Sequence, residues 1–125
     1  MKFNISFHEN GGQFQTANPR SLSKTKSVPY YSFEAESDSG GYLGVLNLIY
    51  TKWGFWETHA YIVERYHGNG FGIKLYEAAI QHARSKGFQV RSSLDTSEMA
   101  KRVWKSKRLR SNFAIKRVRN RYMVH

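Results

Sequence analysis

The sequence predicts a single α+β domain, in which a β-rich first half is followed by a helix-rich second half. Two-residue alternation of apolar and polar side chains dominates up to Tyr66, and a strongly amphipathic helix begins near Gly70. With 125 residues and 40% hydrophobic content, the chain is long enough for one core and too short for two. We therefore expect residues 1–125 to form one domain around a mixed, mainly antiparallel sheet.

The first half contains four predicted strands and one long loop. Lys2–His8 alternates as a first strand, and the Gly-, Ser-, Thr- and Lys-rich stretch Asn10–Pro29 lacks periodicity and is predicted as a loop. Tyr30–Glu36 and Tyr42–Thr51 form a predicted hairpin around a Ser-, Asp- and Gly-rich turn, and Trp56–Tyr66 returns as the next strand. Three successive antiparallel strands therefore lead into a glycine-rich segment.

The helix predicted over Gly70–Lys86 is the clearest element of the second half. Its apolar face consists of Gly72, Leu75, Tyr76, Ala79, Ile80 and Ala83. Charged and amide side chains occupy the opposite face, as in a helix that packs on a sheet. Gly87 ends this helix, and Gln89–Leu94 is predicted as the strand after the crossover.

A second helix is predicted over Thr96–Leu109. Asp95, with Glu98 three residues later, has the spacing of a capping box at the start of this helix. Its apolar face consists of Met99, Ala100, Val103 and Trp104. Asn112–Val124 alternates again and is predicted to form one or two final strands.

A glycine-rich run joins the strand Trp56–Tyr66 to the first helix. The run consists of His67, Gly68, Asn69, Gly70, Phe71 and Gly72. Glycines permit positive φ and close backbone approach, so that several amide groups can converge on one anion at a helix start. The run therefore predicts a pyrophosphate cradle. It is not a Walker loop, because Ile73 and Lys74 follow Gly72, and its G-x-G-x-G spacing departs from the dinucleotide-binding fingerprint.

With its flanks, this run resembles the acyl-CoA-binding motif of the GNAT superfamily of N-acetyltransferases. The family's loop reads Arg or Gln, two residues, Gly, any residue, then Gly or Ala, after a strand with a hydrophobic residue five positions before the Arg or Gln. Ile62 takes the hydrophobic place, Gly70 and Gly72 take the paired-glycine places, and His67 departs from the Arg or Gln. The resemblance covers roughly Glu57–Phe113, and the alternative is a glycine-rich turn that holds no ligand.

The resemblance implies a GNAT-like fold with acetyl-CoA as the cofactor, held around the central helix. It places the loop amides of Gly68–Gly72 on the pyrophosphate, and the backbone N–H groups of Ile62 and Val63 on the pantetheine and the developing oxyanion. In the family two helices usually follow the first strand and help to wall the acceptor site. Those helices are reduced here, since Asn10–Pro29 shows no helical periodicity. The class of acceptor therefore stays open.

A second point of resemblance lies on the helix Thr96–Leu109. The family often shows Asn, two residues, Ala, three residues, then a Tyr that protonates the leaving thiolate. Here Ala100 keeps its place, Ser97 replaces Asn as a cofactor-binding candidate, and Trp104 replaces Tyr. An indole N–H donates a hydrogen bond but is too weak an acid to deliver a proton. Water or another residue such as Tyr122 would then serve, and the alternative for Trp104 is simple core packing.

The proton of the attacking amine needs an acceptor, since the implied mechanism is direct attack without a covalent enzyme intermediate. The family's base is often a carboxylate about ten residues before the loop's Arg or Gln, and Glu57 lies ten before His67. His59 shares the strand face of Glu57 because side chains repeat every second residue, so His59 is the second candidate for the base. The alternative is a solvated carboxylate and a surface histidine.

The positive charge is concentrated near the C-terminus. Half of the twenty Lys and Arg residues follow Ala100, and no acidic residue accompanies them. The outward face of the second predicted helix carries Lys101, Arg102, Lys105 and Arg108. This basic stripe favours a polyanionic partner such as nucleic acid or an acidic protein, the phosphates of the cofactor, or only water. A noncatalytic GNAT-fold module that binds a polyanion is therefore the alternative to an enzyme.

Other classes of site find no support in the sequence. It lacks cysteine, a metal-binding His or carboxylate spacing and a G-x-S-x-G elbow, so we expect no metal, no thiol chemistry and no serine hydrolase. It also lacks a long apolar run or signal peptide, so we expect no membrane contact and a cytoplasmic location. The expected function is transfer of an acetyl group from acetyl-CoA to an amine, on a small molecule or on a protein lysine or N-terminus.

Overall fold

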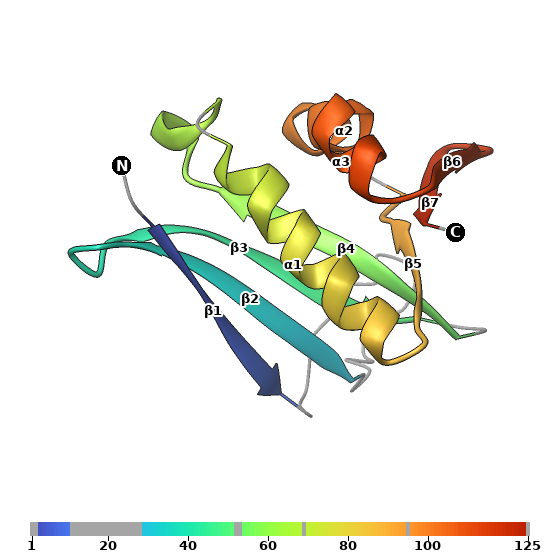
Figure 1. Cartoon of the computed structure of the whole chain (residues 1–125), viewed down its shortest axis with the longest axis horizontal. Coiled ribbons are helices and arrows are strands. Elements are labelled where there is room, and N and C mark those ends of the chain that lie inside the picture. The colour runs from blue at the N-terminus through green and yellow to red at the C-terminus, as the bar shows by residue number, and fades with distance from the viewer. Residues whose placement is uncertain (1–2, 11–28, 52–53, 69, 95, 125) are drawn as a thin grey trace, which may run out of the picture.

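The computed structural model describes residues 3–10, 29–51, 54–68, 70–94 and 96–124, which form a seven-stranded sheet with helices packed on it (Figure 1). The strands are β1 (Phe3–Asn10), β2 (Tyr30–Ser37), β3 (Tyr42–Tyr50), β4 (Phe55–Ile62), β5 (Gln89–Ser92), β6 (Ile115–Val118) and β7 (Arg121–Val124). Their order across the sheet is β1-β2-β3-β4-β5-β7-β6. Among the strands that the structure describes, only β4 and β5 pair in parallel, because a helix forms the crossover between them. The predicted mixed, mainly antiparallel sheet of an α+β fold is confirmed.

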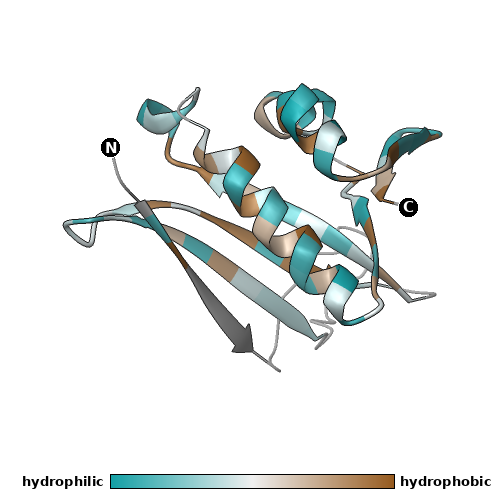
Figure 2. Cartoon of the chain, in the orientation of Figure 1, coloured by the Kyte–Doolittle hydropathy of each residue, from teal (hydrophilic) through white to brown (hydrophobic). Residues whose placement is uncertain are grey.

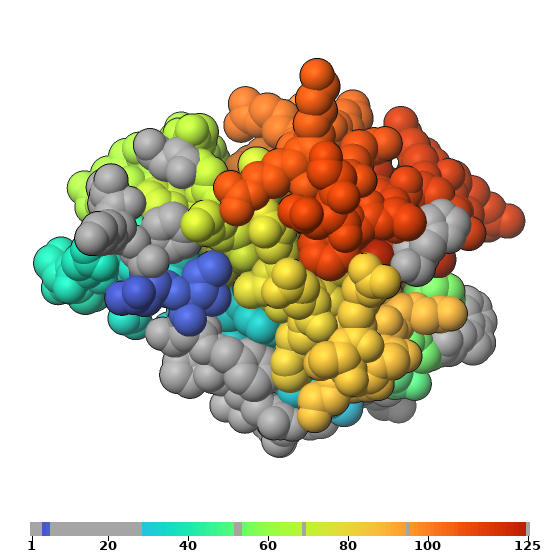
Figure 3. Space-filling view, in the orientation of Figure 1, coloured from blue at the N-terminus to red at the C-terminus, as the bar shows by residue number. Residues whose placement is uncertain are grey.

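The helices are η2 (Glu64–Tyr66, a single 3-10 turn), α1 (Phe71–Ser85), α2 (Glu98–Lys105) and α3 (Lys107–Asn112). α1 lies across the sheet and contacts β2, β3, β4 and β5, whereas α2 and α3 pack beside α1 (Figure 1). Hydrophilic and hydrophobic bands alternate along α1 in Figure 2, as expected for a helix with one apolar face. In Figure 3 the outer surface of α1 (yellow) lies below that of the C-terminal helices (orange to red).

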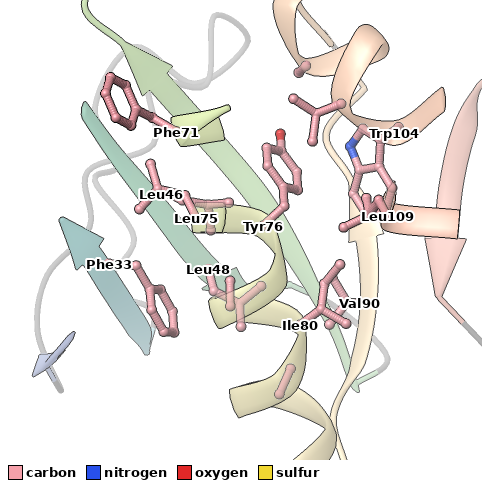
Figure 4. Packing of buried hydrophobic residues seen from close by; sticks show 14 of the residues in the cluster. Phe33, Leu46, Leu48, Phe71, Leu75, Tyr76, Ile80, Val90, Trp104 and Leu109 are labelled. Carbon is pink, nitrogen blue, oxygen red and sulfur yellow. The ribbon is translucent and has the colours of Figure 1, made fainter. Parts of the chain in front are cut away.

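The core lies between α1 and the sheet and continues under α2 (Figure 4). Leu46 and Leu48 of β3 meet Leu75 and Ile80 of α1, and all four side chains are fully buried. Trp104 of α2 is fully buried and belongs to the part of the core that lies under α2. The apolar faces predicted for both helices therefore position α1 and α2 against each other, which determines the shape of the site below.

The strand predicted over Trp56–Tyr66 is too long. β4 ends at Ile62, because the chain turns into η2 and the amide of Tyr66 donates to the carbonyl of Val63 at 2.9 Å. The other strands predicted for the described residues are confirmed, including a final hairpin. Most of the loop predicted over Asn10–Pro29 lies outside the described residues.

The single helix predicted over Thr96–Leu109 is two helices. Ser106 adopts an extended conformation (φ −63°, ψ 142°), and its hydroxyl accepts a hydrogen bond from the amide of Leu109 at 3.3 Å. Ser106 therefore ends α2 and caps α3. The cap of α2 is Ser97, whose hydroxyl accepts an amide hydrogen bond of 3.2 Å, and Asp95, the predicted cap, lies outside the described residues.

β4 extends beyond the end of its neighbour β5. The parallel register ends where Thr58 faces Ser92, whereas β4 continues to Ile62. Beyond this point the edge of β4 faces an opening instead of another strand, and α1 and α2 border the same opening. This divergence of two parallel strands positions the candidate site.

Candidate functional site

Two cavities follow one another along β4 and α2. The first, which we call the loop cavity, has a volume of about 450 Å³ and lies between Ile62, the glycine-rich run, Met99 and Val103. The second, the strand cavity, has a volume of about 250 Å³ and includes Ala60 and Ala100 in its lining. Residues of β4 and of α2 line both cavities, so the two lie next to each other, and we refer to them together as the groove.

The glycine-rich run lines the loop cavity and leads into the N-terminus of α1. Gly68 and Gly70 have φ values of +83° and +82°, and a Cβ atom added to either would meet nothing within 4 Å. Gly70 is also the N-cap of the fifteen-residue helix α1, so the first free amides of that helix point toward the cavity. Arg102 lines the same cavity and adds a cation. Asn69, which we expected to contribute, lies outside the described residues.

His67 and Gly72 have structural roles in this run. His67 Nε2 donates a hydrogen bond of 2.8 Å to the carbonyl of Ile62, so the imidazole holds the turn that leads out of β4. A Cβ atom on Gly72 would lie 3.3 Å from Val103 Cγ2 and 3.6 Å from Met99 Sδ. Gly72 therefore permits the close packing of α1 on α2. Phe71, the first residue of α1, is buried and lines the loop cavity.

The structure keeps one of the two backbone contacts expected from β4 and replaces the other. The amide of Val63 already donates to the carbonyl of Leu43 at 2.9 Å, so Val63 is not available to a ligand as we expected. Along an antiparallel strand the hydrogen-bonding groups alternate in direction, which turns the backbone of Ala60 and Ile62 toward the opening. The sequence predicted the contact of Ile62 and missed that of Ala60. Only the register of β3 against β4 shows which residues of β4 bond to β3 and which turn their backbone toward the opening.

Glu57 forms the centre of an ion-pair cluster. Its Oε2 lies 2.7 Å from Arg121 Nη1 and 3.0 Å from Arg91 Nη2, and its Oε1 lies 3.6 Å from His59 Nε2. Burial on its own would raise the pKa of this carboxyl, but hydrogen bonds from His59 and Arg121 and the charges of Arg121 and Arg91 lower it to about 2. A carboxylate with so low a pKa is a poor proton acceptor. The structure therefore argues against the role of base that we expected for Glu57.

Trp104 and Ser97 both line the strand cavity. The Trp104 indole is fully buried, stacks on Tyr122 with ring centroids 5.8 Å apart, and meets Tyr76 edge-on at 5.3 Å. Trp104 thus combines the core packing and the cavity position that the sequence left as alternatives. Tyr122, considered as a substitute acid, is 4% exposed and does not line this cavity.

The residues of the expected basic stripe have different surroundings. Its members are Lys101, Arg102, Lys105 and Arg108. Lys101 pairs with Glu98 at 3.3 Å, and Arg108 pairs with Glu77 at 2.7 Å. Arg102 instead lines the loop cavity beside the glycine-rich run. The charge of the stripe is therefore divided between ion pairs and the lining of the loop cavity.

Comparison with known families agrees with this geometry. Residues 4–106 match the family model described as the acetyltransferase (GNAT) family. Because the match spans most of the chain, the protein belongs to the GNAT family. A comparison with curated proteins gave no significant match. Among the described residues no helix is long and apolar enough to cross a membrane, and no group of three or more metal-ligand side chains comes together.

Solved structures share the fold at low sequence identity. An acyl-CoA N-acyltransferase from Pseudomonas aeruginosa is 13% identical with a TM-score of 0.59, and the alignment covers 98% of each chain. An IAA acetyltransferase from Bacillus cereus is 17% identical with a TM-score of 0.56, covering 97% of this chain and 96% of that chain. A GNAT-family acetyltransferase from Streptococcus pneumoniae is 19% identical with a TM-score of 0.56, and the chain spans 64% of its length.

Proposed function

We propose that the protein is an N-acetyltransferase that binds acetyl-CoA in the groove and transfers the acetyl group directly to an amine. The observation that carries this proposal is that the loop cavity and the strand cavity follow one another along β4 and α2. The loop cavity offers backbone amides and the cation of Arg102 for phosphates, and the strand cavity reaches the opening between β4 and β5. A long ligand with an anionic end and a reactive end suits this arrangement.

The residues of the loop cavity fit the phosphate end of the cofactor. The amides around Gly68 and Gly70, the N-terminus of α1 and the guanidinium of Arg102 all favour a pyrophosphate. The backbone of Ala60 is turned toward the groove and suits the amide-rich pantetheine arm. Acetyl-CoA, when bound, supplies an acetyl group activated as a thioester.

His59 is the residue that we assign to accept the proton of the attacking amine. It lines the strand cavity, and its Nε2 lies 3.6 Å from the carboxylate of Glu57. The carboxylate of Glu57 lies beside the imidazole of His59 and fixes its orientation. Glu57 therefore acts as a positioning residue, and Arg91 and Arg121 hold it in place.

The acceptor reaches the thioester through the face of the sheet opposite α1. The lining of the strand cavity includes Asn47, His59 and Tyr61 from that face, as well as Thr58 and Tyr76 from the helix side. The cavity thus connects the two sides of the sheet where β4 and β5 diverge. Both a small-molecule amine and a protein lysine or N-terminus are compatible with this open approach.

Isothermal titration with acetyl-CoA tests the proposal. Wild-type protein should bind, and Gly70→Asp should not, because a carboxylate then lies where the phosphate binds. Gly40→Asp is the matched control, since Gly40 also has a positive φ (+85°) with open space around it but lies in the β2–β3 turn. Equal binding by both variants, or no binding by the wild type, would refute the proposed site.

A further inference from the structure

A third cavity, which we call the basic cavity, lies between α2 and the β6–β7 hairpin, on the side of the molecule where Figure 1 shows both. Its volume is about 350 Å³. Lys101 and Lys105 of α2 line it on one side, and Arg117 and Asn120 of the hairpin line it on the other. No acidic residue is part of the described lining. The hollow therefore presents three positive charges and no negative one.

These positive charges are poorly neutralised within the protein. Neither Lys105 nor Arg117 forms an ion pair with any residue that the structure describes. Lys101 pairs with Glu98, but the Glu98 side chain is 85% exposed, so water screens this pair. The guanidinium of Arg117 lies over the ring of Tyr122, 5.7 Å from its centroid, which holds its charge at the cavity. Cations gathered around one hollow repel each other, and a bound anion relieves this repulsion.

The basic cavity adjoins the strand cavity at the connection between β5 and α2. Ser93 lines the strand cavity, Leu94 lines the basic cavity, and Thr96 lines both. The hydroxyl of Thr96 donates a hydrogen bond of 2.8 Å to the carbonyl of Ser93, which keeps this connection compact. Leu94 is 72% exposed. The two cavities are therefore separated only by a short piece of chain that lies at the surface.

The same helix supplies a wall to each cavity. Ala100 and Trp104 line the strand cavity, and Lys101 and Lys105 line the basic cavity. Each lysine follows its partner by one residue, so the two pairs lie on neighbouring faces of α2. Because a helix with its side chains is about 10–12 Å across, the two cavities are within reach of one small molecule.

We propose that the basic cavity binds a carboxylate or phosphate group of the acceptor, so that the substrates are small amines that also carry an anionic group. This proposal rests on the proposed function, because it places the reacting amine in the strand cavity beside His59. Lysine and arginine side chains bind both kinds of anion through charge-assisted hydrogen bonds. A single hollow suits one such group better than the extended phosphate backbone of a nucleic acid.

The charge of the whole protein makes such an acceptor favourable. The chain carries a formal net charge of +11, which repels an amine that is cationic in solution. An anionic group on the same molecule offsets this repulsion, and the basic cavity would orient the molecule by binding that group. The amine would then lie at the strand cavity, while the anion lies between α2 and the hairpin.

Binding of matched amines to the protein saturated with coenzyme A, measured by NMR titration, tests the inference without turnover. The pairs are γ-aminobutyrate with butylamine, ε-aminocaproate with hexylamine, and aminoethyl phosphate with ethanolamine. In at least one pair the anionic member should bind about tenfold more tightly than its neutral-tailed partner. A preference in the first two pairs identifies a carboxylate as the anion, and one in the third pair identifies a phosphate.

Two double substitutions separate the cavity from the net charge. Lys105→Gln with Arg117→Gln should abolish the preference and leave acetyl-CoA affinity unchanged, since neither residue lines the loop cavity or the strand cavity. Lys86→Gln with Lys107→Gln removes the same charge outside the basic cavity and should preserve the preference. If the preferred amine is acetylated, the first double substitution should raise its KM more than it lowers kcat.

The outcomes distinguish this inference from the proposed function. Acetyl-CoA binding without a preference in any pair would overturn the acceptor site and leave the proposed function standing. An equal loss of preference in both double substitutions would overturn it too, because net charge would then explain the preference. Binding of duplex DNA that is lost in Lys105→Gln with Arg117→Gln, without any amine preference, would make the cavity part of a polyanion surface instead. If the wild type does not bind acetyl-CoA, both proposals fail.

Discussion

Replacement of Glu57 by Gln tests the ion-pair cluster beneath the site. The pKa of Glu57 falls from 4.5 to about 2 in the folded protein, a difference of about 2.5 units. At 1.36 kcal/mol per unit, the charged carboxylate contributes about 3 kcal/mol to the free energy of unfolding at pH 7. The carboxylate is only 13% exposed, so solvent screens this contribution little. Glu57→Gln should therefore destabilise the protein by about 3 kcal/mol, because Arg91 and Arg121 lose their counter-ion.

Urea denaturation at several pH values measures this effect and its sign. A carboxylate whose pKa is lowered by folding stabilises the protein fully above its unfolded pKa of 4.5, and the contribution disappears as the pH falls to about 2. The difference between wild type and Glu57→Gln should therefore shrink over this interval. Glu98→Gln is the control, since Glu98 is 85% exposed and its ion pair should contribute little. A Glu57→Gln effect no larger than the control, or one independent of pH, would refute the reasoning.

Three further substitutions test two parts of the groove and the cap of α3. Arg102→Gln should weaken acetyl-CoA binding by about tenfold in titrations, because Arg102 lines the loop cavity. Lys105→Gln, outside that cavity, is the control and should leave the affinity unchanged. Equal effects of the two substitutions would mean that only the net charge of the protein affects binding. His59→Ala should lower the turnover of an identified acceptor about 10²-fold with unchanged acetyl-CoA affinity, and full turnover would exclude His59 as the base. Ser106→Ala should cost about 1 kcal/mol of unfolding free energy because α3 loses its cap, and an unchanged urea midpoint would contradict this.

Local patterns predicted most of the fold. The alternation of Tyr30–Glu36 and Tyr42–Thr51 and the apolar face of Gly70–Lys86 each reflect neighbours a few residues apart, and the structure confirms the strands and the helix. The conformation of the glycine-rich run was also predictable, because glycine is the residue type that readily adopts the positive φ values seen at Gly68 and Gly70. These features needed no knowledge of distant contacts.

The features that the sequence did not predict depend on contacts between residues far apart in the chain, or on a side chain that competes with the helix for a backbone hydrogen bond. The proton-accepting role expected for Glu57 ignored Arg121, which is 64 positions away in the chain and only 2.7 Å away in space. The availability of Ala60 instead of Val63 follows from the register of two strands. The break at Ser106 interrupts a continuous helical pattern, because a serine hydroxyl competes with the helix for a backbone amide.

The position of acetyl-CoA in the groove is the central claim, and amide chemical shifts measured by NMR during titration with acetyl-CoA test it most directly. We expect the largest changes at Gly68, Gly70 and the first amides of α1, with further changes along β4 at Ala60 and at Arg102 on α2. The β1–β2 edge of the sheet should change little. Changes concentrated instead on the basic β6–β7 hairpin, with none at the glycine-rich run, would contradict the account and identify a polyanion-binding surface in place of a cofactor groove.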